Sequence, residues 1–234
     1  MYPAAAPAAM AAGAAAGYIT AFLQTKMRIP SILAGIITNT GLYTVNLAVM
    51  GFSSNVSLLK ADTVFTALKP LLGTYYRLVP AAVLALLAAA LLVLFLRTRL
   101  GLSIRATGDN PDMVRASSIN TAFTVTVGLC IANALTALSG AILAQYQKTA
   151  DINLGTGMVI IGLASLIIGE TLTRKGSVGL KAFGAVLGSI LYRFIIALAL
   201  RLDLPSECLK LISAVIVALA IGLPALRAEK KGAV

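Results

Sequence analysis

The chain has 234 residues, of which 59% are hydrophobic and only 12% are charged, and its mean hydropathy is +0.94. Soluble domains carry roughly 25% charged residues, so this composition excludes an ordinary soluble domain and indicates an integral membrane protein, with lipid around most side chains. The net charge of +11 does not predict a nucleic-acid partner, because the basic residues fall between apolar runs and are explained first by membrane topology.

Seven runs contain the about 20 mainly apolar residues that a membrane-spanning helix needs. They are residues 4–23, 31–50, 79–96, 121–145, 154–172, 180–200 and 209–226. Continuous apolar runs of this length argue against the alternating strands of a membrane β-barrel. The sequence predicts an all-α fold, a polytopic transmembrane helical bundle of about seven spans, with residues 1–234 forming a single domain.

The first run is mostly Ala and Gly as far as Gly17, so it suits close packing between helices better than contact with lipid alone. No secretory signal peptide is visible, because no basic residues precede the apolar run. A weakly apolar, signal-like leader is the alternative interpretation of this segment.

Polar residues within the spans are candidates for a solute pathway or for hydrogen bonds between helices. Asn39 and Asn46 are seven residues apart and therefore share one helix face, which makes them the best pathway pair. Asn133 and Gln145 have the same two interpretations, and packing is the favoured role for each of the four residues.

A polar segment, residues 105–119, separates the third and fourth apolar runs. Asn110 can cap a helix, Pro111 suits the first helical position, and Asp112 favours the positive helix N-terminus. A short exposed helix is therefore expected to begin after Asn110. A solvated loop is the alternative.

The last third of the chain contains many glycines, and Gly184 and Gly188 form a GxxxG pair that lets helices approach closely in lipid. Arg193 lies inside a predicted span, where a charge is expensive unless it meets water or a partner. A role in the pathway or at a subunit interface is therefore expected for Arg193.

Alternation of the seven spans orients the chain, because Lys and Arg are enriched in cytoplasmic connections. One side would hold six basic residues, namely Lys60, Lys69, Arg77, Lys148, Arg201 and Lys210. The other would hold twelve, namely Lys26, Arg28, Arg97, Arg99, Arg105, Arg115, Arg174, Lys175, Lys181, Arg227, Lys230 and Lys231. The second side is predicted to be cytoplasmic, together with the polar segment and the C-terminus, and the chain would start outside.

The usual ingredients of catalysis are missing from the sequence. It has no His and only eight acidic residues, which are scattered, so neither a catalytic residue nor a metal site is predicted. It also lacks the GxxxxGK(S/T) loop that cradles phosphates. We expect no enzyme activity and no cofactor in this chain, and any ATP would be bound by a partner subunit.

The polar segment and its flanks resemble the permease subunits of ABC importers of the branched-chain amino acid and ribose type. Residues 105–120, RATGDNPDMVRASSIN, are similar to that family's cytoplasmic coupling region, with Gly108, Asn110 and Ala116 at matching positions. Residues 29–51, IPSILAGIITNTGLYTVNLAVMG, and 138–170, LSGAILAQYQKTADINLGTGMVIIGLASLIIGE, resemble a subgroup regarded as aromatic amino acid (tryptophan or tyrosine) permeases. That subgroup usually carries earlier apolar segments with a DLTVDGSF-like stretch, so this sequence is expected to be incomplete at its N-terminus.

The resemblance implies that residues 108–119 form a coupling helix that docks on a cytoplasmic ATP-binding subunit. The residues expected to take part in this coupling are Arg105, Gly108, Asp109, Asn110, Pro111, Met113, Arg115 and Ala116. An external solute-binding protein would deliver a small solute, with an amino acid expected, and two copies would form a homodimer in the cell membrane. The rival interpretations are a secondary transporter or channel, and an inactive membrane remnant.

Overall fold

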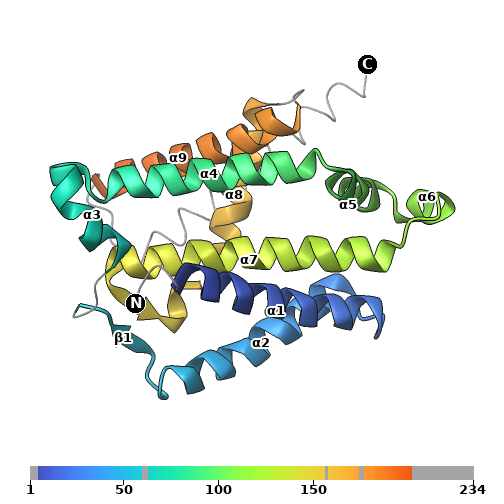
Figure 1. Cartoon of the computed structure of the whole chain (residues 1–234), viewed down its shortest axis with the longest axis horizontal. Coiled ribbons are helices and arrows are strands. Elements are labelled where there is room, and N and C mark those ends of the chain that lie inside the picture. Colours follow the sequence, from blue (N-terminus) through green and yellow to red (C-terminus); the bar gives the residue numbers. More distant parts are fainter. Residues whose placement is uncertain (1–4, 60–62, 156–157, 174–176, 202–234) are drawn as a thin grey trace. The chain divides into compact units, whose positions relative to one another are not determined.

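The computed structural model describes residues 5–59, 63–155, 158–173 and 177–201 (Figure 1). The chain forms two compact units, residues 1–153 and 154–234, and each is described by itself. The described residues are mainly helical, and five of their helices are long and apolar enough to cross a membrane. These five are α1 (Ala5–Thr25), α2 (Ser31–Val49), α4 (Leu78–Leu96), α7 (Thr121–Gln147) and α9 (Val178–Arg201).

The five helices lie at five of the seven predicted spans, with ends that differ by a few residues. The predicted span at 154–172 is wrong at its start, because Leu154 and Gly155 belong to the 3-10 helix η2 (Ile152–Gly155) and α8 (Met158–Leu172) has 15 residues. At about 1.5 Å per residue, α8 is shorter than the about 30 Å hydrocarbon layer. The predicted span at 209–226 lies outside the described residues.

The connection between α2 and α4 contains structure that the sequence did not predict. Strand β1 (Asn55–Ser57) pairs antiparallel with β2 (Thr149–Asp151), which follows α7. Helix α3 (Val64–Leu72) starts with a capping box between Thr63 and Thr66 and leads into the 3-10 helix η1 (Gly73–Tyr75). Gln145 of α7 accepts a hydrogen bond from the backbone of Val64 at 3.2 Å. Gln145 therefore has the packing role that was favoured for it, and this connection folds against the C-terminal end of α7.

Helices α1 and α7 pack closely in the first unit because α1 presents glycines to α7. A methyl group at Gly13 would lie 2.5 Å from the backbone oxygen of Asn133, and one at Gly17 would lie 2.5 Å from that of Leu129. The Ala- and Gly-rich start of the chain thus packs between helices, as its small residues predicted. A buried hydrogen bond of 3.0 Å from the Thr20 hydroxyl to that of Thr38 joins α1 to α2.

In the second unit, too, glycines let two helices pack closely. Helices α8 and α9 run antiparallel, since Thr173 and Gly169 meet Gly184 while Gly169 and Ser165 meet Gly188. A methyl group at Gly188 would collide with the backbone oxygen of Ser165, so the two backbones approach as closely as glycine allows.

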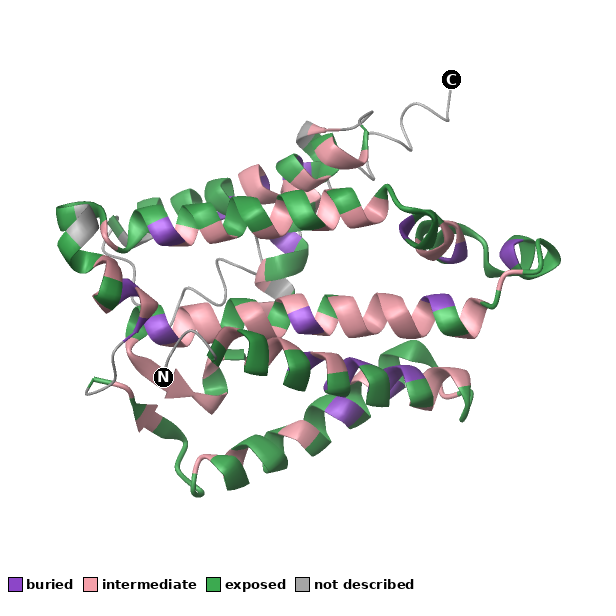
Figure 2. Cartoon of the chain, viewed as in Figure 1, coloured by how far each residue is buried: buried purple, intermediate pink, exposed green. Residues whose placement is uncertain are grey.

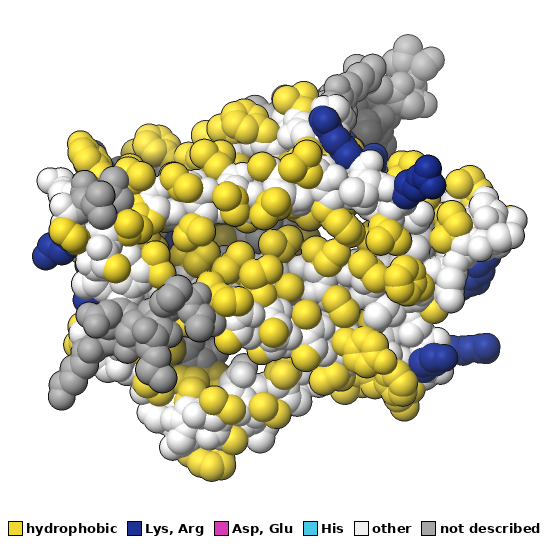
Figure 3. Space-filling view, in the orientation of Figure 1, with side chains coloured by type: hydrophobic (Ala, Val, Ile, Leu, Met, Phe, Trp, Pro, Cys, Tyr) yellow, Lys and Arg dark blue, Asp and Glu magenta, His cyan; other side chains and the backbone are white. Residues whose placement is uncertain are grey.

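The span surfaces of the first unit are apolar and largely uncovered. Figure 2 shows exposed and half-buried residues along most of the helices, with the few buried ones scattered among them. On α4, Leu86, Leu87, Leu91 and Leu94 are each more than half exposed. Figure 3 shows hydrophobic side chains over the helices and Lys and Arg side chains toward the ends. This distribution fits helices that are surrounded by lipid.

The first unit has two ends, and basic residues are more numerous at one of them. The turn between α1 and α2 lies at the same end as residues 97–120, whereas β1, α3 and β2 lie at the other (Figure 1). Basic residues at the first end are Lys26, Arg28, Arg97, Arg99, Arg105 and Arg115, and the described ones at the other are Lys69, Arg77 and Lys148. The alternation of spans assumed for the topology therefore holds within this unit.

Candidate functional site

Two consecutive helices replace the single short helix that was expected in the polar segment. Helix α5 (Arg99–Asp109) begins at Thr98, whose hydroxyl accepts a hydrogen bond from the Gly101 backbone at 3.2 Å. Gly101 is required because its Cα lies against the backbone of Phe95 and Leu96, where a methyl group would collide. Arg105, Gly108 and Asp109 therefore belong to α5, and the expected helix over residues 108–119 is wrong in its bounds.

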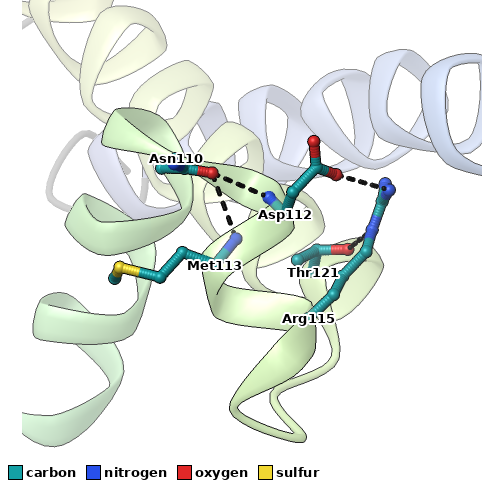
Figure 4. Close-up of polar contacts among 5 residues, drawn as sticks. All are labelled: Asn110, Asp112, Met113, Arg115 and Thr121. Atoms are coloured by element: carbon teal, nitrogen blue, oxygen red, sulfur yellow. Dashed lines mark hydrogen bonds and ion pairs between the residues drawn. The ribbon is translucent and has the colours of Figure 1, made fainter.

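The second helix, α6 (Pro111–Ala116), starts where the residue chemistry placed it. Asn110 is extended, with φ −153° and ψ 97°, so the chain breaks there between α5 and α6. Its side-chain oxygen accepts hydrogen bonds from the backbone N–H groups of Asp112 and Met113, both at 3.1 Å (Figure 4). Pro111 occupies the first helical position, where its missing N–H costs nothing.

The α6 helix is anchored on one side and presents the rest of its surface. Val114 is 1% exposed, whereas Met113 is 58% exposed. The eight residues that were predicted to couple to an ATP-binding subunit are all exposed, namely Arg105, Gly108, Asp109, Asn110, Pro111, Met113, Arg115 and Ala116. The exposed surface of this capped helix therefore combines the apolar side chain of Met113 with charged side chains, and such a surface is suited to docking.

Arg115 ties α6 to the start of α7. Its Nε donates to the Thr121 hydroxyl at 3.2 Å, and its guanidinium contacts the Asp112 carboxylate at 3.3 Å (Figure 4). Both charged side chains are largely exposed, so the ion pair itself contributes little to stability. Its effect is to orient the guanidinium at the surface of α6.

A groove, formed by three adjoining cavities that all include Gln24, lies between α1, α2, α5 and α7. The first, of about 720 Å³, opens beside α6 and is lined by Arg28, Thr107, Pro111 and Arg115 among others. The second, of about 370 Å³, includes Ser31, Thr107 and Thr124. The third, of about 470 Å³, is lined in part by Thr20, Ser31, Thr38, Asn39 and Asn133. The groove therefore runs from the side of α6 into the membrane-spanning region.

The predicted pathway residues are only partly brought together. Asn39 lines the groove together with Asn133, whose amide also donates to the Leu129 backbone at 2.9 Å. Asn46 is exposed on α2 and lines none of the three cavities. Arg193 is exposed on α9 in the second unit and forms no hydrogen bond or ion pair with another described residue.

Several residues of the groove were missed from the sequence. Gln24, Thr20 and Thr38 are not charged and none of them belongs to a recognisable motif. A usable signal was present in the spacing, because Thr20 and Gln24 are four residues apart and Ser31 and Thr38 are seven apart, which gives each pair one helix face.

Comparison with known proteins identifies the family. The family model described as "Branched-chain amino acid transport system / permease component" matches residues 1–221. A tyrosine transport system permease protein of Clostridioides difficile is 36% identical over 209 residues, which cover 89% of this chain and 68% of that protein. An uncharacterized protein of Rickettsia prowazekii is 31% identical over 212 residues, covering 89% and 74%.

A more distant relative is the xylose transport system permease protein of Haemophilus influenzae, 31% identical over 118 residues, which cover 50% of this chain and 31% of the relative. No solved structure gives a significant match. The family match along nearly the whole chain agrees with the apolar spanning helices and with the resemblance of the polar segment. The chain belongs to the family of permease components of branched-chain amino acid transport systems and is a multi-pass membrane protein.

Proposed function

We propose that this chain is the membrane-spanning subunit of an ATP-driven importer that takes up an amino acid of the aromatic class. The tyrosine permease relative supports the solute class. In this proposal the chain performs no covalent chemistry and holds no cofactor or metal, and the two compact units work as one permease domain. Energy comes from ATP bound by a cytoplasmic partner subunit.

The observation that carries the coupling role is the construction of α6. Asn110 caps the helix, Val114 anchors it, and Met113 remains exposed. The helix lies in the chain between α5 and the spanning helix α7. A connector that only joined α5 to α7 would not need a capped turn with an exposed apolar side chain. We assign α6, together with the exposed end of α5, to docking on the ATP-binding subunit.

The groove, with its few polar side chains, is the proposed route of the solute within this subunit. The side-chain amide groups of Gln24, Asn39 and Asn133 can replace water around a polar solute, and they lie in helices whose other faces are apolar. Asn46 continues the same face of α2 beyond the groove. The route would be completed by a second copy of the chain.

The proposed assembly is a homodimer in the cell membrane. In this proposal the end of the first unit that carries α6 faces the cytoplasm, and the C-terminus of the chain is cytoplasmic as well. The larger number of basic residues at the α6 end of the first unit supports this orientation. Arg193 is exposed in a spanning helix, where an isolated charge is costly, so we assign it to the pathway face between two copies. An external solute-binding protein would dock on the opposite side.

The test is reconstitution of the chain in liposomes with its cognate ATP-binding subunit and solute-binding protein. We expect uptake of radiolabelled tyrosine that requires ATP and all three proteins, and we expect competition by phenylalanine or tryptophan but not by xylose. The matched control replaces the ATP-binding subunit with a variant that binds ATP but does not hydrolyse it.

Uptake that persists without the ATP-binding subunit would contradict the ATP-driven importer and would favour a secondary transporter. ATP-dependent uptake of xylose but not of tyrosine would contradict the solute class while keeping the mechanism.

A further inference from the structure

Two buried hydroxyl groups join α5, which leads into α6, to the spanning helix α7. The Thr107 hydroxyl, in the last turns of α5, lies 2.9 Å from the Thr124 hydroxyl, in the first turn of α7. Thr107 is 7% exposed and Thr124 is 2% exposed. We propose that Thr107 and Thr124 are positioning residues that couple movement of α5 and α6 to α7, an inference that rests on the proposed ATP-driven transport.

The two hydroxyl groups have two protons between them but lie within hydrogen-bond distance of each other and of two backbone oxygens. Thr107 also lies 2.7 Å from the Ser103 backbone oxygen, and Thr124 lies 2.9 Å from that of Thr121. We call the hydrogen bond between the Thr107 and Thr124 hydroxyls the joint. Because each hydroxyl has one proton, one of them donates across the joint while the other donates to its own helix. Loss of either hydroxyl leaves the other with its backbone acceptor, so removal of the joint leaves no buried polar group unpaired.

The joint lies where a movement of α5 would reach the groove. Thr107 and Thr124 both line the cavity that also includes Gln24. The neighbouring contact along the same interface is between Ile104 and Gly128, where a methyl group would meet the Ile104 side chain at 3.3 Å. The hydroxyl pair thus lies beside an apolar contact on the same α5–α7 interface, and a directional hydrogen bond there would resist sliding of the two helices.

Helix α7 then carries the movement along its length. It is continuous from Thr121 to Gln147, and two turns beyond Thr124 it meets α1 through Leu129 and Asn133. Those residues line the cavity that contains Asn39. A shift of α7 at its first turn would therefore change the groove between α1, α2 and α7 without any intervening loop to absorb it.

Other threonines on α7 supply matched controls. The hydroxyls of Thr126 and Thr136 donate to backbone oxygens of their own helix, Ala122 and Ala132, at 2.7 and 2.9 Å. Thr126→Val removes a hydroxyl from the same helix, close to Thr124, without touching α5. A role that is merely structural predicts similar effects for Thr124→Val and Thr126→Val.

The experiment measures solute transported per ATP hydrolysed in liposomes that contain the chain, its ATP-binding subunit and its solute-binding protein. For Thr107→Val and Thr124→Val we expect normal association with the ATP-binding subunit, continued hydrolysis, and a transport ratio that falls about threefold, as for loss of one inter-helix hydrogen bond in a membrane. The double variant should fall no further than either single one, because all three lack the same joint. Thr107→Ser, which keeps the hydroxyl, should retain the wild-type ratio.

A wild-type ratio in both Thr107→Val and Thr124→Val would overturn the inference, as would an equal fall in Thr126→Val. If one valine variant does not fold, the other and the Thr107→Ser and Thr107→Ala pair give the same comparison. A wild-type chain that shows no ATP-dependent uptake would instead overturn the proposed function and the inference with it, so the two failures are distinguishable.

Discussion

The contacts between spanning helices and the short helices α5 and α6 are specified in opposite ways. Where α1 meets α7 and where α8 meets α9, the sequence removes side chains, and glycine lets backbones touch. At the starts of α5 and α6, the sequence adds polar side chains that satisfy exposed backbone groups, with Thr98 and Asn110 as the respective caps. Lipid supplies no hydrophobic force between helices, so close contact must supply the attraction there, whereas water competes for every hydrogen bond at the polar end.

This contrast predicts how the two regions respond to substitution. An added atom in a glycine contact has no space to occupy, so it should reduce stability strongly wherever the helices touch. A lost polar group at the docking helix should change local order and binding more than overall stability.

The largest effect is expected for Gly17→Leu, which places a side chain against the Leu129 backbone and forces α1 away from α7. We expect a loss of about 3 kcal/mol in the free energy of unfolding, measured by SDS titration in mixed micelles. The control is Gly140→Leu on α7, where nothing lies within 4 Å of an added methyl group. Equal losses for both variants would show that the α1–α7 contact does not determine stability.

A somewhat smaller effect is expected for Gly188→Ala, because one methyl group collides with the Ser165 backbone and the α8–α9 pair must separate slightly. The expected loss is about 2 kcal/mol in the same titration. Gly162→Ala on α8 has open space around the new methyl group and should be neutral or slightly stabilising. A neutral Gly188→Ala would contradict the close antiparallel contact.

Removal of the cap by Asn110→Ala should reduce the stability of the α6 helix by about 1 kcal/mol. If α6 docks on the ATP-binding subunit, affinity between the two proteins should fall about fivefold, measured by titration of the labelled subunit, and uptake should fall with it. Asn110→Asp keeps an oxygen acceptor and should bind nearly as well as the wild type. Intact association and uptake in Asn110→Ala would show that the cap has no part in coupling.

The smallest effect is expected for Asp112→Asn, which removes the exposed ion pair with Arg115 but leaves the cap and the bond from Arg115 to Thr121. The stability of the chain should not change measurably, because water screens this pair. A marked destabilisation in thermal unfolding would mean that charge pairing, and not capping, holds α6 in place.

The sequence predicted the features that depend on neighbours along the chain. Five spans follow from apolar runs, and the start of α6 follows from Asn110 and Pro111 because a cap is a contact over three residues. The resemblance to the permease family was confirmed by the family match, and the similarity to a tyrosine transport permease agrees with the subgroup that the two longer stretches indicated.

Features that depend on distant contacts were not predictable in the same way. The strands β1 and β2 have three residues each and exist because residues 55–57 meet residues 149–151. Helix α5 has no apolar run to mark it and was treated as part of a polar connection. The groove brings Gln24 and Asn133 together from helices that are far apart in the sequence, and neither residue indicates the other in advance.

The central claim, that α6 is the docking element of an ATP-driven permease, is tested most directly by a photocrosslinking amino acid introduced at Met113. The matched position is Val49, an exposed apolar residue at the opposite end of the same unit. In membranes that contain the assembled transporter, we predict a crosslink to the ATP-binding subunit from position 113 and none from position 49. No crosslink from position 113 in a complex that transports solute, or a crosslink from position 49 instead, would contradict the account.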